Sequence, residues 1–120
     1  MTFTYTELNT EEKKLKFING LYPVENNDKL RWIWTSKRVF GTSSNIKSLI
    51  IHLNSEIENT LYFEEMSSKI ENDALNVIKI DLTNKSDFSI EVDKLLKPKN
   101  DERELGFKIV RIIIDNEIVF

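Results

Sequence analysis

Cysteine is absent from the 120-residue chain, and histidine occurs only once, as His52. Without cysteine the chain can form neither a disulfide nor a thiolate metal site, and one imidazole cannot supply the several ligands of a histidine-rich zinc centre. Glycine and proline are also scarce, with three and two residues. Three separated glycines cannot build a phosphate-binding loop or a dinucleotide fingerprint. We therefore expect no metal ion and no cofactor.

Neither sign of charge dominates the chain, which has 17 Lys and Arg residues, 20 Asp and Glu residues and a net charge of −3. This balance argues against broad binding of nucleic acid or of an anionic membrane. No apolar run approaches the roughly 18 residues of a membrane span, and residues 1–10 lack the pattern of a secretory signal. We expect a cytoplasmic protein with no nucleic-acid partner and no membrane insertion.

Short runs between turn residues alternate apolar and polar side chains, as half-buried strands do. Seven runs are predicted as strands: residues 30–35, 46–53, 60–64, 75–82, 88–92, 107–114 and 117–120. Asp115-Asn116, between the last two runs, predicts a tight hairpin. Seven or eight short antiparallel strands predict an all-β fold. Such strands build either a sandwich or a barrel, and of the two we expect a two-sheet β-sandwich of jelly-roll or immunoglobulin-like type.

The last long run breaks its own alternation. Phe107 and Ile109 share one parity, whereas Ile112 and Ile114 share the other. A β-bulge near Val110 would explain the change, and so would a strand that is buried on both faces.

Helical signals are weak. Thr10 is followed by two glutamates, as in a capped first turn, and residues 13–18 would either continue this helix or begin a strand. Residues 64–70 are the second helical candidate. We expect at most one or two short helices.

The chain fits a single domain, residues 1–120, by its length. It stops at the apolar segment 118–120, whereas natural termini are often polar and frayed. We interpret this as a domain taken from a longer protein, although a docked terminal strand would look the same.

Catalytic chemistry lacks a recognisable set of residues. The acids occur in turns or alternate with apolar residues, and no spacing marks the shielded carboxylate pair that glycoside hydrolysis requires. His52 has the opposite parity to the apolar face of Leu49, Ile51 and Leu53, and the chain has no second histidine. We expect no catalytic residue and no enzymatic activity.

Aromatic residues are the more informative signal. Trp32 and Trp34 are two apart on one predicted strand and therefore share a face, and Tyr22 precedes them by a turn. Exposed Trp and Tyr side chains suit the apolar faces of sugar rings, whereas aromatic residues on a central strand usually belong to a core. We assign Trp32 to the structure and leave Trp34 open between the core and a sugar-binding face.

Two segments carry a family resemblance. The first is Gly20-Leu21-Tyr22-Pro23-Val24-Glu25, which leads to Arg31-Trp32, and the second is Asp101-Glu102-Arg103-Glu104-Leu105-Gly106, which enters the apolar run 107–114. Together they resemble a β-sandwich module that occurs beside glycosyltransferase domains in bacterial and archaeal proteins of surface-polysaccharide synthesis. The resemblance spans residues 17–114, and its middle strands match only in pattern.

The motif residues also have a physical interpretation. Glu25, Arg31 and Arg103 would form a charge cluster that ties the first loop to the last strand, since arginine binds carboxylates through a planar fork. Gly20 permits a positive φ, and Gly106 lets the backbone turn into the final strand. We favour a structural motif of Gly20, Trp32, Asp101, Arg103 and Gly106 over a binding site. The candidate ligand-binding residues are Tyr22, Glu25, Arg31 and Trp34.

The resemblance implies a non-catalytic accessory module that binds carbohydrate or positions a neighbouring catalytic domain. The alternative is a protein-interaction or self-association module without a glycan ligand. Sandwich edges can pair with partner strands, and residues 112–120 are the predicted edge for homo-association.

Overall fold

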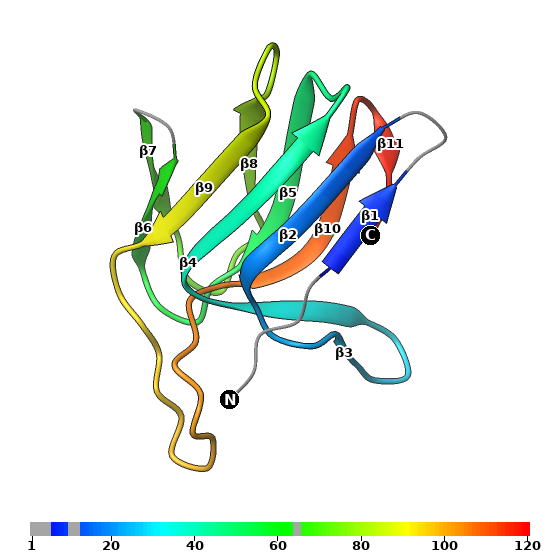
Figure 1. Ribbon diagram of the computed structural model, residues 1–120. Helices are drawn as coiled ribbons and strands as arrows, with labels where there is room; N and C mark the ends of the chain where they lie inside the picture. Colours follow the sequence, from blue (N-terminus) through cyan, green and yellow to red (C-terminus); the bar gives the residue numbers. More distant parts are fainter. Residues whose placement is uncertain (1–5, 10–12, 64–65) are drawn as a thin grey trace.

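The computed structural model describes residues 6–9, 13–63 and 66–120, which form eleven strands and no helix (Figure 1). The strands are β1 (Thr6–Asn9), β2 (Lys14–Leu21), β3 (Glu25–Asn26), β4 (Arg31–Ser44), β5 (Ser48–Asn54), β6 (Asn59–Phe63), β7 (Met66–Ile70), β8 (Asn76–Asp81), β9 (Asp87–Val92), β10 (Lys108–Ile114) and β11 (Glu117–Ile118). Among these residues no helix is long and apolar enough to cross a membrane.

The strands belong to one antiparallel sheet rather than two. Seven strands follow one another in the order β7-β6-β9-β4-β10-β5-β8, and the sheet curls into a nearly closed barrel. β2 also pairs with β4 and carries β1 on its other side, while β3 pairs with β4 and β11 with β10. The predicted two-sheet sandwich is therefore wrong, because a shared strand joins the two walls.

That shared strand is β4, which is 14 residues long where the sequence predicted only residues 30–35. Its first part pairs with β10 through Ile33 and Trp34, and its second part pairs with β9 over residues 38–42. Strands of ordinary length with alternating apolar and polar residues are compatible with both a sandwich and a barrel. The unbroken continuation of β4 from one wall to the other decides between the two architectures.

Gly20 marks the place where β4 bends. Opposite it the register shifts, since Asn19 faces Phe40 while Leu21 faces Thr35. Gly20 has a φ of 100°, and a Cβ there would lie 2.7 Å from the Cα of Val39. Only glycine combines this backbone conformation with so close an approach of two strands.

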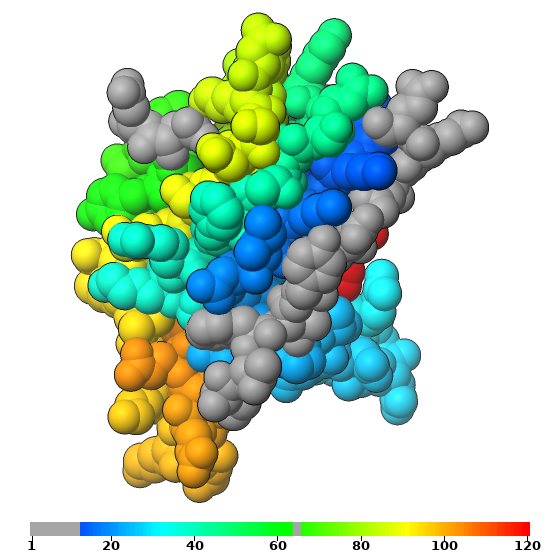
Figure 2. Space-filling view, in the orientation of Figure 1, coloured from blue at the N-terminus to red at the C-terminus, as the bar shows by residue number. Residues whose placement is uncertain are grey.

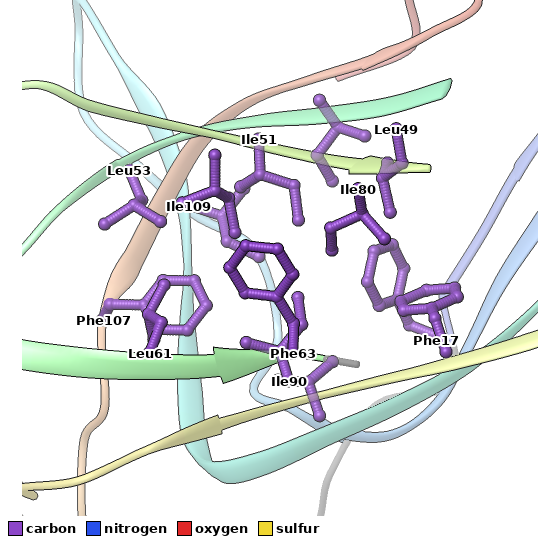
Figure 3. Close-up of a cluster of buried hydrophobic side chains, with 14 of the residues drawn as sticks. Phe17, Leu49, Ile51, Leu53, Leu61, Phe63, Ile80, Ile90, Phe107 and Ile109 are labelled. Atoms are coloured by element: carbon purple, nitrogen blue, oxygen red, sulfur yellow. The ribbon is translucent and has the colours of Figure 1, made fainter. Parts of the chain in front are cut away.

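The core fills the space between the walls (Figure 3). Alternate residues of the longer strands point inward, as Leu49, Ile51 and Leu53 do on β5. The rings of Phe17 and Phe88 meet edge to face at 5.5 Å between centroids and join β2 to β9. Burial of these apolar side chains is the main driving force for closing the sheet.

In the final strands, the structure supports the bulge over the alternative of a strand buried on both faces, and the predicted hairpin is confirmed. The register of β10 against β5 shifts between Ile109 and Arg111, so Val110 is the bulged residue. Asp115 and Asn116 have φ values of 46° and 70° and form the turn into β11. The tight hairpin needs two positive φ angles, which Asp and Asn tolerate.

The helical candidates have other outcomes. Residues 14–21 form β2 and residues 66–70 form β7, so neither is helical. Residues 10–12 and 64–65, which carried the remaining helical signals, lie outside the described residues. Residues 112–120 were predicted to form an edge. Residues 112–114 instead belong to β10 and pair with β5, and only β11 remains as an outer strand beside β10.

Candidate functional site

The long connection from β9 to β10, residues 93–106, folds back along β4. Leu96 and Leu105 exchange backbone hydrogen bonds of 2.7 and 2.8 Å, which close this connection into a narrow loop. Its end is fastened to β4, since the Gly106 amide donates to the Thr35 carbonyl at 2.7 Å. A Cβ on Gly106 would lie 2.6 Å from the Ser36 carbonyl oxygen, so glycine permits this contact.

Beneath this loop lies a second, smaller apolar cluster outside the main core. Tyr22, Trp34 and Leu105 are its buried members, and Trp32 and Leu96 pack against them. Trp34 is only 8% exposed, whereas Trp32 is half-buried. Of the two alternatives for Trp34, the structure therefore supports a packed cluster rather than an open sugar-binding face.

Lys108 of β10 lies beside both tryptophans of this cluster. Its ammonium nitrogen is 5.4 Å from the centre of the Trp32 ring and 5.5 Å from that of the Trp34 ring. Both distances are within reach of cation–π attraction. The polar edge of the cluster is thus occupied by a side chain of the protein itself.

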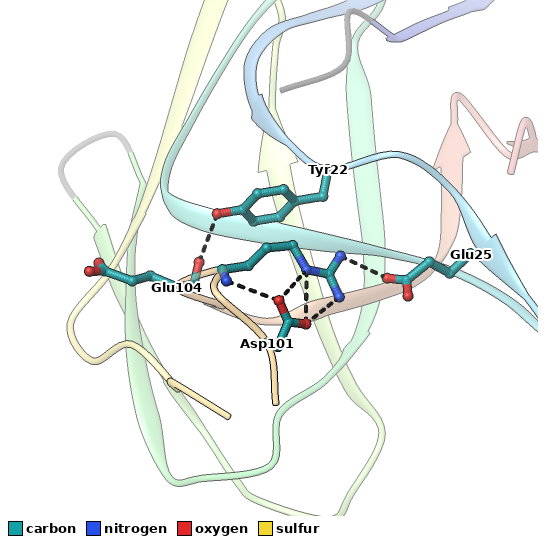
Figure 4. Close-up of polar contacts among 5 residues, drawn as sticks. Tyr22, Glu25, Asp101 and Glu104 are labelled. Carbon is teal, nitrogen blue, oxygen red and sulfur yellow. Dashed lines mark hydrogen bonds and ion pairs between the residues drawn. The ribbon is translucent and has the colours of Figure 1, made fainter. Parts of the chain in front are cut away.

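Arg103 links this cluster to two carboxylates (Figure 4). Its Nη2 donates to Asp101 Oδ2 at 2.6 Å, and its Nη1 donates to Glu25 Oε2 at 3.1 Å. The guanidinium lies 5.3 Å from the ring centre of Tyr22, whose hydroxyl donates to the Glu104 carbonyl at 3.1 Å. The Arg103 side chain is only 15% exposed, and that of Asp101 is 24% exposed, so this pair is partly shielded from water, whereas Glu25 is 37% exposed.

The electrostatics of the cluster follow from these contacts. Hydrogen bonds from the Arg103 side chain and amide lower the pKa of Asp101 below its ordinary value. The hydrogen bond to Asp101, with that to Glu25, raises the pKa of Arg103. Burial raises the pKa of the Tyr22 phenol, against the opposing effect of Arg103. Arg103 and Asp101 thus each stabilise the ionised form of the other.

The structure brings some of the predicted site residues together and separates another. Glu25 and Arg103 meet, and Asp101 joins them as a second carboxylate. Arg31 forms no ion pair with the described residues, and its guanidinium lies 4.7 Å from the centre of the Phe120 ring. Chemically, this arrangement fastens the loop 93–106 to β4 and to the segment that begins β3.

His52 lies on β5, where its register partners are Val77 of β8 and Arg111 of β10. It is half-buried. Within the described part of the chain, no group of three or more His, Asp or Glu side chains is placed to hold a metal ion.

An open groove of about 470 Å³ lies on the outer side of the wall formed by β4, β9 and β6. Figure 2 views this wall from outside, with β4 in cyan to green and β9 in yellow. The described residues that line the groove are Arg38, Phe40, Tyr62, Phe63, Asp87, Phe88, Ser89 and Glu91.

Two exposed aromatic side chains flank the groove. Phe40 on β4 is 40% exposed and Tyr62 on β6 is 44% exposed. Ser89 of β9 pairs with Phe40, and Glu91, two residues along the same face, pairs with Tyr62. Phe40 and Tyr62 therefore lie on the two strands that flank β9, with Ser89 and Glu91 of β9 between those strands.

Polar side chains stand beside these rings. Arg38 donates through Nε and Nη2 to the same Glu91 oxygen, Oε1, at 3.2 and 2.6 Å. Asp87 is exposed and pairs with Thr42 of β4, two residues beyond Phe40. The groove therefore combines two exposed aromatic side chains with hydrogen-bond donors and acceptors.

The sequence patterns did not predict that Phe40 and Tyr62 lie on one surface. Phe40 falls in residues 36–44, which contain too few apolar residues to predict a strand. Tyr62 did carry a signal, because it has the opposite parity to Leu61 and Phe63, which predicts an outward-facing aromatic residue.

Comparisons with family models, with curated proteins and with solved structures found no match.

Proposed function

We propose that the protein is a non-catalytic module that binds carbohydrate in the groove between Phe40 and Tyr62. The observation that carries the proposal is the pair of exposed aromatic side chains, Phe40 and Tyr62, on the two strands that flank β9. Aromatic rings present a large apolar surface, and the C–H faces of sugar rings pack against such surfaces. Buried aromatic residues such as Trp34 do not offer this contact.

The polar side chains of the groove fit the hydroxyl groups of a sugar. Each hydroxyl both donates and accepts hydrogen bonds. Arg38 supplies donors, Glu91 supplies acceptors, and Ser89 supplies both. A flat ring with hydroxyls around its edge therefore finds apolar contacts on its faces and polar contacts along its rim.

The wider context that we propose is a place beside a glycosyltransferase domain. It rests on the two sequence motifs alone, because the chain forms one nearly closed sheet and not the β-sandwich of that family. The Arg103 cluster has a structural part in this proposal, because it fixes the loop 93–106 against β4.

Removal of either ring tests the proposal. Titration calorimetry with a panel of oligosaccharides should detect binding that Phe40→Ala and Tyr62→Ala each weaken by about tenfold, or 1.4 kcal/mol. Leu75→Ala removes an apolar side chain that is at least as exposed, from the connection before β8, and should leave binding unchanged. Equal affinity of all four proteins would contradict the site, and absence of binding to every glycan would contradict the function.

A protein-interaction module is the second candidate. The nearly closed sheet leaves β7 and β8 at the ends of its strand order, and Val77 on β8 is exposed. Exposed edges can accept a partner strand. Sedimentation at increasing protein concentration would reveal self-association, and a strictly monomeric profile would contradict it.

A further inference from the structure

We infer that the groove between Phe40 and Tyr62 selects neutral glycans and rejects acidic ones. This inference rests on the proposed function and adds the substrate class. Among the residues that the structure describes, the charged side chains that line the groove are one cation, Arg38, and two carboxylates, Asp87 and Glu91. An acidic sugar would therefore meet more negative than positive charge.

The cation that the described lining of the groove contains is already paired with a carboxylate. Nε and Nη2 of Arg38 both donate to Oε1 of Glu91, which offsets the positive charge, while the other N–H groups of the guanidinium can still donate to neutral hydroxyls. Oε2 of Glu91 accepts no hydrogen bond from the described residues. A carboxylate oxygen of this kind accepts a hydrogen bond from a neutral hydroxyl and repels a uronate, sulfate or phosphate group.

Asp87 adds a second negative charge beyond Ser89. It is exposed, and its cross-strand partner Thr42 is uncharged. Neighbouring segments carry Lys16, which pairs with Thr42 from β2, and Lys85, which precedes β9. Neither lysine lines the groove. The net charge of −3 on the whole chain acts in the same direction at low salt.

The test compares neutral and acidic oligosaccharides of equal length. The neutral set contains glucose, mannose, galactose and N-acetylglucosamine oligomers, and the acidic set contains oligogalacturonate and hyaluronan fragments. Calorimetry should show at least one neutral ligand bound about tenfold or more tightly than every acidic ligand. The difference should narrow as salt screens the charges.

Two double variants distinguish the effect of the charges in the groove from the effect of the net charge of the protein. Asp87→Asn with Glu91→Gln should raise affinity for the acidic oligomers. Glu56→Gln with Asp73→Asn makes the same change in net charge at exposed positions outside the groove and should not.

Three outcomes decide the question. Acidic ligands that bind as tightly as neutral ones, in a manner that depends on Phe40, would overturn the neutral selectivity and leave the proposed function intact. Equal gains in both charge variants would also overturn it, since selectivity would then come from net charge. Absence of binding to every oligomer would overturn the proposed function and the selectivity together.

Discussion

Each half of β4 places an aromatic side chain on the outside of the same sheet, but one of these side chains is buried and the other is exposed. In the first half, Trp34 is covered by the loop 93–106 and is 8% exposed. In the second half, none of the described segments covers Phe40 in this way, and its side chain is 40% exposed. An outward-facing aromatic residue therefore becomes part of a core or part of a surface according to what the rest of the chain places over it.

The polar groups of the two regions differ in the same way. Arg103 is held by Asp101 and Glu25 in a shielded network that fastens a loop. Arg38 is exposed and pairs with Glu91 at the surface. Exposed ion pairs contribute little to stability, whereas removal of one member of a shielded network leaves a charge without its partner. Mutations in the two regions should therefore separate stability from binding.

The largest expected effect comes from Trp34→Ala, paired with Phe40→Ala on the same strand. Loss of the buried indole should lower the free energy of unfolding by about 3–5 kcal/mol, as for other large-to-small changes in a packed cluster. Loss of the exposed Phe40 ring should cost less than about 1 kcal/mol. Chemical denaturation of both variants measures the difference. Similar destabilisation by both would show that the two halves do not differ as described.

Arg103→Ala should have the next largest effect. It removes the hydrogen bonds to Asp101 and Glu25 and the contact with Tyr22, and we expect a loss of about 2–3 kcal/mol. Thermal melting measures this loss, with Lys99→Ala as the control at an exposed position of the same loop. A variant that melts like the wild type but loses glycan binding would instead place Arg103 in a ligand site.

Sequence alone recovered the parts of this structure that depend on neighbouring residues. The bulge at Val110 and the Asp115-Asn116 turn follow from side-chain parity and from local backbone preference. The length of β4 did not follow, because residues 36–44 carry few apolar side chains. Closure of the sheet depends on the full length of β4. Because that length was not predicted, the nearly closed sheet was not predicted either.

The candidate site was harder to predict for a related reason. The pairing of Glu25 with Arg103 was expected from the motif and is present. Arg31 does not join this charge cluster and lies over the Phe120 ring instead. Arg31 and Trp32 are neighbours on one strand, so their side chains point to opposite sides of the sheet. The burial of Trp34 depends on the path of residues 93–106, for which local patterns give no information.

The smallest expected effect is on the pH dependence of stability, through Asp101. Arg103 lowers the pKa of Asp101 from its ordinary value of 3.8, so ionised Asp101 stabilises the folded state above that pH. This stabilisation is lost as the pH falls through the lower pKa of the folded state. Asp101→Asn should therefore be less stable than the wild type at neutral pH, and the difference should narrow as the pH falls below 3.8.

Denaturation series of the wild type and Asp101→Asn across this pH range measure the effect. Asp81 and Asp115, whose pKa values are also lowered, are present in both proteins, so their titration cancels in the difference. A narrowing difference would show that the charge of Asp101 holds Arg103 in the shielded network. A difference that stays constant into acid would show that Asp101 acts through its shape and hydrogen bonds instead, and the contrast between the shielded and the exposed arginine would then not rest on charge.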